Sequence, residues 1–70
     1  MDMLKIKDKI FNKSLIKYIE KSYLYRHSAY CIDVYFTDYK SITIEFDSEQ
    51  DRDKEFDEIM KAMRSEAEYG

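Results

Sequence analysis

Large apolar residues alternate with mostly polar residues along the middle of this chain, which is typical of strands buried on one face. The apolar positions form two runs with a period of two, at Ile32, Val34, Phe36, Ile42, Ile44 and Phe46. The short segment 38–41 lies between the runs. The pattern therefore predicts a β-hairpin over residues 29–47.

Two weaker strands are predicted upstream, within residues 3–11 and 15–23, with the connection 12–14 between them. In the second, Ile16 and Ile19 are three positions apart, which suits a turn of helix or a bulged strand better than regular alternation, and of the two we favour the strand. The chain has no glycine before its last position. We therefore expect a residue such as Asp38 to adopt any positive φ in the central turn, because aspartate tolerates this conformation.

The period changes from two to that of an α-helix after Asp47. Apolar side chains follow at helical spacing, at Phe56, Ile59, Met60 and Met63. Ser48 is placed to cap the helix, and Asp51 follows three positions later. The pattern predicts an amphipathic helix over about residues 49–67.

Together these elements predict a single α+β domain covering residues 1–70. We expect four antiparallel strands in one small sheet, in the order β-β-β-β-α, with the helix packed on one face. A chain of this length has a small core. It is therefore more suited to presenting surfaces than to enclosing a site.

The composition excludes several kinds of chemistry. One cysteine cannot form an internal disulfide, and one cysteine with one histidine cannot complete a four-ligand zinc site. The lack of internal glycine excludes glycine-rich phosphate loops. We expect no metal and no cofactor. We also expect a cytoplasmic protein, because no signal peptide or membrane-spanning apolar run is evident and the free thiol of Cys31 suits a reducing compartment.

His27 and Cys31 are the only histidine and cysteine in the chain. A cysteine nucleophile needs a base, a group that orients this base and oxyanion donors, and the sequence shows no such set. We interpret His27 as an exposed loop residue and Cys31 as a half-buried thiol. No catalytic residue is predicted, and we expect a protein that is not an enzyme.

Charge is unevenly distributed along the chain. Residues 1–26 hold seven basic and three acidic residues, whereas residues 41–60 hold eight acidic and two basic residues. Helix capping and the helix dipole explain part of the acidic excess. Like charges four positions apart, as at Asp53 and Asp57, disfavour a helix and suggest a docking role. The predicted partner-binding residues are Glu45, Asp47, Glu49, Asp51, Asp53, Asp57 and Glu58.

Tyrosines supply a second candidate surface. If the apolar strand residues face the helix, polar and aromatic residues line the other face of the sheet. As an alternative to the acidic face, this predicts a homodimer face at Tyr18, Tyr35, Thr37 and Thr43. Direct nucleic-acid binding is a weaker prediction, because the acidic residues Asp33 and Glu45 share that face and would repel phosphates. Cross-strand tyrosine packing is a purely structural alternative.

The stretch from Ser41 to Met60 resembles the strand-to-helix junction of small proteins encoded by phages and mobile elements of low-GC Gram-positive bacteria. It differs at Asp38-Tyr39, where such proteins commonly have Asp-Gly. The resemblance implies a small inhibitor in the cytoplasm of a bacterial host, similar in character to anti-CRISPR proteins. It would bind and block a host nucleic-acid-handling or defence protein through an acidic face. The alternatives are a homodimeric structural or regulatory protein and a nucleic-acid or nucleotide binder.

Overall fold

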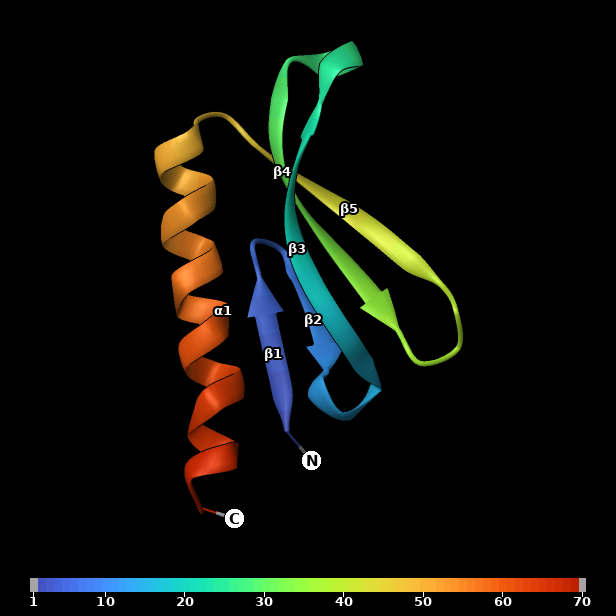
Figure 1. The fold of residues 1–70 in the computed structure, drawn as a ribbon, viewed down its shortest axis with the longest axis vertical. Helices are drawn as coiled ribbons and strands as arrows, with labels where there is room; N and C mark the ends of the chain where they lie inside the picture. Colours follow the sequence, from blue (N-terminus) through green and yellow to red (C-terminus); the bar gives the residue numbers. More distant parts are fainter. Residues whose placement is uncertain (1, 70) are drawn as a thin grey trace.

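The computed structural model describes the backbone of residues 2–69 and the side chains of residues 2–64. Two short 3-10 segments, Lys13–Leu15 and Tyr25–His27, precede β3 and β4. The α+β class is confirmed (Figure 1). The elements are β1 (Met3–Ile6), β2 (Lys9–Asn12), β3 (Ile16–Leu24), β4 (Ala29–Phe36), β5 (Ser41–Phe46) and α1 (Glu49–Tyr69).

The prediction of one four-stranded sheet is wrong, because the strands form two antiparallel sheets, β1-β2 and β3-β4-β5. The range 3–11 is not one strand. Lys7, at a φ of 56°, reverses the chain so that Ile6 pairs with Lys9. The resulting hairpin points Leu4, Ile6 and Phe11 towards the core. A tight turn without glycine separates β1 from β2. It interrupts the alternation within residues 3–11, so the sequence shows no clear hairpin signal there.

A β-bulge in β3 explains the irregular spacing of its isoleucines. The register between β3 and β4 shifts between Ile16 and Tyr18. Ile16 pairs with Phe36, and Ile19 pairs with Val34, so both isoleucines face the core although they are three positions apart. A bulge inserts one residue and resets the alternation of faces. The bulged strand anticipated from the sequence is therefore confirmed.

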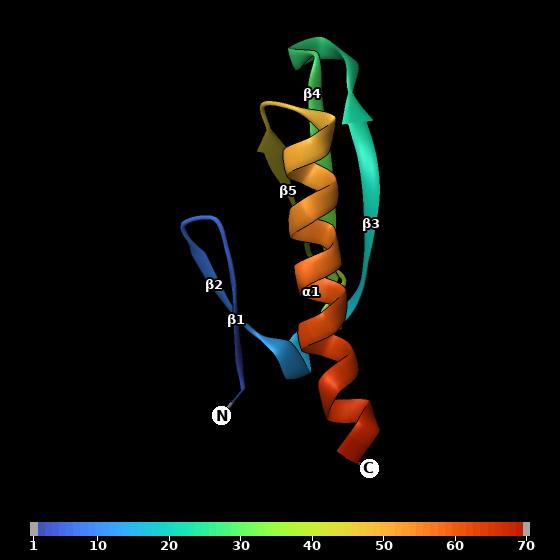
Figure 2. The same cartoon turned by 90° about the vertical axis from the view of Figure 1, so that its left-hand side faces the viewer.

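One face of the three-stranded sheet is covered jointly by α1 and the β1-β2 hairpin (Figures 1 and 2). The expected apolar alternation of β4 and β5 faces this side and is confirmed. Phe11 of the hairpin and Phe36 of β4 lie with ring centroids 5.7 Å apart. The buried members of the core cluster are Leu4, Ile6, Ile32, Val34, Ile44, Phe46 and Ile59.

In the turn between β4 and β5, which contains no glycine, the residue with the positive φ is not the one that we expected. Tyr39, not Asp38, has the positive φ, at 70°. Asp38 instead uses its carboxylate to accept a hydrogen bond of 3.1 Å from the backbone N–H of Lys40. This contact is the typical turn-forming role of aspartate. At the start of α1, Ser48 Oγ accepts the N–H of Asp51 at 3.1 Å, which confirms the predicted cap.

Arg52 is a buried cation that fastens α1 to the sheet. It is only 6% exposed. Its Nη1 donates to the carbonyl oxygens of Ser22 on β3 and Cys31 on β4, at 2.9 and 3.2 Å. Its Nε donates to Asp53 Oδ1 at 2.7 Å, and its guanidinium lies 5.5 Å from the ring centroid of Tyr30. A single side chain thus links the helix with two strands.

We predict that Arg52→Ala lowers the free energy of unfolding by about 3 kcal/mol, near the upper end for hydrogen bonds to charged groups. Alanine favours helix formation, so the loss would reflect tertiary contacts alone. Lys54→Ala, at an exposed position of the same helix, should change stability by less than about 0.5 kcal/mol. Urea unfolding followed by circular dichroism measures both variants. Equal stabilities would contradict the anchoring role of Arg52.

Candidate protein-binding surfaces

The other face of the three-stranded sheet carries no covering element in the described part of the chain (Figure 1). We call it the open face. Strand alternation and the two registers determine which side chains it presents. They are Tyr18, Glu20, Ser22 and Leu24 of β3, Ala29, Cys31, Asp33 and Tyr35 of β4, and Ser41, Thr43 and Glu45 of β5. Ala29 and Cys31 point to this side but are buried by their neighbours.

Two tyrosines stack on the open face. Tyr18 and Tyr35 are cross-strand partners, with ring centroids 4.3 Å apart and ring planes 16° from parallel. Tyr18 is 47% exposed. Of the predicted dimer face, the structure brings Tyr18, Tyr35 and Thr43 onto one surface, whereas Thr37 lies beyond the end of β4. The stack provides a rigid aromatic platform.

Three carboxylates share the open face with the tyrosines, and each is held by a hydrogen bond. Glu20 Oε1 accepts the Tyr35 hydroxyl at 2.9 Å, and Asp33 Oδ1 accepts the Thr43 hydroxyl at 2.8 Å. Glu45 Oε2 lies 2.8 Å from His27 Nδ1. The open-face positions include no lysine or arginine. The described surface is therefore acidic, and its charges are fixed in place.

The hydrogen bond to Glu20 changes the titration of Tyr35. The Glu20 carboxylate accepts a hydrogen bond from the neutral phenol and would repel a phenolate. It therefore raises the pKa of Tyr35 to about 12 from the usual 10.0, with burial adding to the effect. Neutral Tyr35 thus donates to Glu20 throughout the physiological range.

His27 and Cys31 do not form a catalytic pair. Cys31 is fully buried rather than half-buried as expected, because it lies in the central strand between Ser22 and Glu45. Burial raises the pKa of its thiol, and the carboxylates of Glu45 and Asp33 raise it further. A nucleophilic cysteine needs the opposite shift. His27 is exposed, as expected, and its imidazole contacts Glu45.

The predicted acidic residues of α1 are divided between two flanks of the helix. Glu49, Asp53 and Asp57 follow at intervals of four on the flank beside β3. Asp53 Oδ1 lies 3.1 Å from Lys21 Nζ and also accepts Arg52 Nε, and these two cations lower the pKa of its carboxyl. Part of this flank thus attaches the helix to the sheet.

Asp51 and Glu58 lie on the opposite flank with Glu55, which accepts the backbone N–H of Lys7 at 3.3 Å. Lys54 and Lys61 are seven positions apart and occupy the solvent-facing ridge between the two flanks. Asp47 lies in the connection before the helix, and Glu45 belongs to the open face. The seven predicted partner-binding residues therefore do not form one continuous surface.

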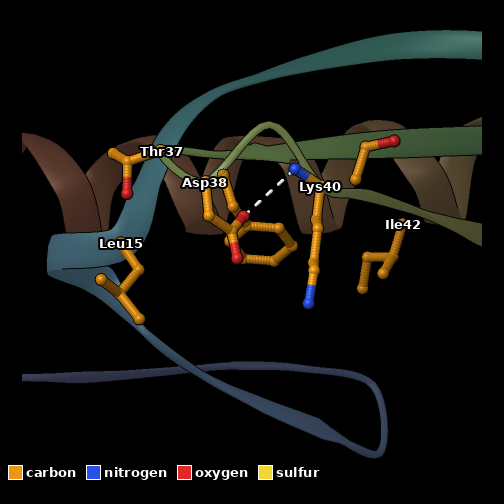
Figure 3. Close-up of a pocket in the computed structure, with 7 residues that line it drawn as sticks. Leu15, Thr37, Asp38, Lys40 and Ile42 are labelled. Carbon is orange, nitrogen blue, oxygen red and sulfur yellow. Dashed lines mark hydrogen bonds between the residues drawn. The ribbon is translucent and has the colours of Figure 1, made fainter.

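A cavity of about 450 Å³ lies beneath the turn between β4 and β5 (Figure 3). Leu15, Phe36 and Ile42 give it apolar walls. Figure 3 shows the side chains of Asp38 and Lys40 on the same side of the turn as Leu15 and Ile42. The turn is fastened beside the cavity by the N–H of Thr37, which donates to Leu15 O at 2.9 Å. The cavity is large enough for a small apolar group.

A second hollow, of about 350 Å³, lies between the start of β3 and the later turns of α1. We call it the β3-α1 groove. Apolar side chains dominate it, and Met60 is 41% exposed there. Its lining residues are Ile16, Lys17, Tyr18, Ile19, Met60, Met63 and Arg64.

Sequence reasoning placed Asp33 and Glu45 on the tyrosine face but missed Glu20. The available signal was the alternation within 18–24, which puts Glu20 two positions from Tyr18 on the same side of a strand. The bulge at Ile16 obscured the phase of that alternation. The β3-α1 groove was also missed, because it depends on how the helix crosses the sheet.

The described residues contain no group of histidine, cysteine, aspartate and glutamate side chains arranged to hold a metal ion. Nor is any helix among them long and apolar enough to cross a membrane. Comparison of the chain with models of protein families, with curated proteins and with solved structures finds no match. The surfaces themselves therefore carry the functional argument.

We predict that Glu20→Gln returns the pKa of Tyr35 from about 12 towards 10.0. The raised pKa stabilises the folded state below pH 10, and this contribution is lost as the pH rises through 12. Carbon-13 NMR of the tyrosine rings across alkaline pH measures the shift. Glu45→Gln, on the same face but bonded to His27, serves as the control. A wild-type Tyr35 that ionises at its usual pKa would contradict the assigned bond.

We also predict that Cys31 reacts with a thiol reagent at least about tenfold more slowly in the folded protein than in denaturant, because the thiol is buried and its pKa is raised. The variant Thr43→Cys in a Cys31→Ser background is the matched control, since position 43 is exposed on the same face. It should react at the rate of a free thiol. Equal rates for the two cysteines would refute the burial argument.

Proposed function

We propose that this protein is a binding module without enzymatic activity, which docks its open face onto a basic surface of another protein. The observation that carries the proposal is the composition of that face: a stacked tyrosine pair and three hydrogen-bonded carboxylates, without a lysine or arginine. Tyrosine is enriched in protein interfaces, and carboxylates complement a basic partner.

The fixed geometry of the face supports a binding role. Tyr35 and Thr43 hold Glu20 and Asp33 by their hydroxyl groups, so these carboxylates need little further ordering when a partner arrives. Preorganised groups lose less conformational entropy on association than mobile surface charges. The stack of Tyr18 on Tyr35 adds aromatic area that is already rigid. The surface is thus suited to recognition.

The charge of the face selects among partners. Nucleic acid would bring phosphates against Glu20, Asp33 and Glu45, which is unfavourable. A second copy docked face to face would bring the same three carboxylates against their equivalents. A basic protein surface is compatible with this charge, including a surface that otherwise holds nucleic acid. Occupying such a surface would make the protein an inhibitor, as the phage-protein resemblance implies.

The test begins with affinity capture of proteins from a Gram-positive bacterial lysate. The affinity of each captured protein for the purified wild-type chain is then measured. We predict that the variant Glu20→Gln, Asp33→Asn, Glu45→Gln binds at least about tenfold more weakly and that added salt weakens wild-type binding. The captured protein should also lose nucleic-acid binding when the wild type is added. Thermal unfolding checks that the variant folds, since each substitution nearly preserves side-chain shape.

A helix variant with Asp51→Asn, Asp57→Asn and Glu58→Gln removes three charges outside the open face and should bind as the wild type does. If this control loses binding instead, the acidic helix is the docking surface and the proposal for the open face fails. Salt-sensitive binding of the purified chain to single-stranded DNA or RNA oligonucleotides would favour a nucleic-acid binder. In that case too the proposal is overturned.

A further inference from the structure

The outer edge of β3 is an unpaired strand edge. β3 runs from Ile16 to Leu24 and pairs only with β4 among the described strands. Figure 2 shows no element beyond β3 on that side. At the opposite edge, the β1-β2 turn approaches β5, and Lys7 Nζ donates to the backbone oxygen of Glu45 at 2.7 Å. The β3 edge therefore presents backbone groups that another strand could pair with.

The β3-α1 groove lies directly beside this edge. Its strand wall is the first part of β3, including Ile16 and Ile19, and its helix wall includes Met60 and Met63. Methionine side chains adapt their shape to different apolar partners. A strand added to β3 would direct every second side chain towards the helix side of the sheet, where the groove lies. An edge and a side-chain pocket thus occur together.

Two cations border the groove. Lys17, in the bulge of β3, and Arg64, on α1, both line it, and neither has an ion-pair partner among the described residues. Lys21, further along β3, is already engaged by Asp53. Lys17 Nζ lies 5.8 Å from the ring centroid of Tyr39, and Asp57 borders a neighbouring hollow together with Met60 and Arg64. The charges that line the groove itself are positive, opposite to those of the open face. They favour an occupant that carries carboxylates next to an apolar residue.

We propose that the β3 edge and the β3-α1 groove together bind an extended acidic peptide from a partner protein by strand addition. The peptide backbone pairs with β3, an apolar side chain enters between Ile19 and Met60, and flanking carboxylates contact Lys17 and Arg64. Backbone pairing then gives affinity, and the pocket gives specificity.

A second copy of this chain fits the edge less well. Its β3 would bring Lys17 and Lys21 to an edge that already carries these cations. The site is independent of the proposed docking of the open face, since it uses the sheet edge and the opposite charge. Variants at the two sites can therefore fail separately.

The test uses a capped synthetic peptide in which valine and threonine alternate between terminal glutamates, titrated into the isotope-labelled full chain and followed by amide NMR. We expect saturable shifts centred on β3 and on residues 60–64. Met60→Glu, which places a carboxylate in the groove, should weaken binding at least about tenfold. Gln50→Glu makes the same change of charge at an exposed helix position outside the groove and should have no effect.

Two altered peptides distinguish backbone pairing with β3 from nonspecific binding to the surface. N-methylation of alternate backbone nitrogens, on the side that pairs with β3, removes the donors and should abolish binding. Replacing the glutamates by lysines should weaken it at least about tenfold, and Lys17→Glu with Arg64→Glu should restore affinity for this lysine peptide. Thermal unfolding verifies that each variant folds.

Each contrary result overturns the inference. Absence of shifts at millimolar peptide would show that the edge takes no such ligand. Equal binding of the N-methylated peptide would show that no strand is added. A concentration-dependent dimer in light scattering, with the amides of β3 protected and the peptide excluded, would assign the edge to a second copy instead.

Discussion

The packing of α1 on the sheet depends on the buried guanidinium of Arg52. A buried charge is tolerated only when its donors are satisfied, and Arg52 satisfies them with two strand carbonyls and the Asp53 carboxylate. This requirement fixes the first turns of the helix over β3 and β4. The later turns then run beside the start of β3 and form one wall of the β3-α1 groove. One buried cation thus helps to set the position of the helix on the sheet and, with it, the helix wall of the groove.

A second constraint on the structure is that only one face of the three-stranded sheet is covered. In the described part of the chain, α1 and the β1-β2 hairpin are the elements that cover the sheet, and both pack on the same side. The open face remains in contact with solvent and uses hydroxyl–carboxylate hydrogen bonds such as Tyr35 to Glu20. The tertiary structure thereby sorts the charges. Carboxylates gather on the open face, whereas Lys17 and Arg64 lie at the β3 edge.

Much of the fold could be predicted because its signals are local. The alternation around Ile32 and Ile44 predicted two strands, and Ser48 with the helical spacing of Phe56 and Ile59 predicted the capped helix. The hairpin of β1 and β2 was missed because Lys7 forms its turn without a glycine signal. The structure distributes the predicted partner-binding residues over more than one surface. Like-charged helix pairs suggested one acidic face, but Asp53 and Glu55 are engaged by Lys21 and the backbone of Lys7.

The sequence by itself determined the α+β class, the inward-facing apolar positions of β4 and β5 and the amphipathic helix. These features depend on periods of two and of about 3.6 residues, which are written within a few neighbouring positions. Only the tertiary structure decided the division into two sheets, the fastening by Arg52 and the placing of Glu20 beside Tyr35. The last two join residues that are 15 and 30 positions apart. Such contacts depend on how the elements pack, and no local period encodes them.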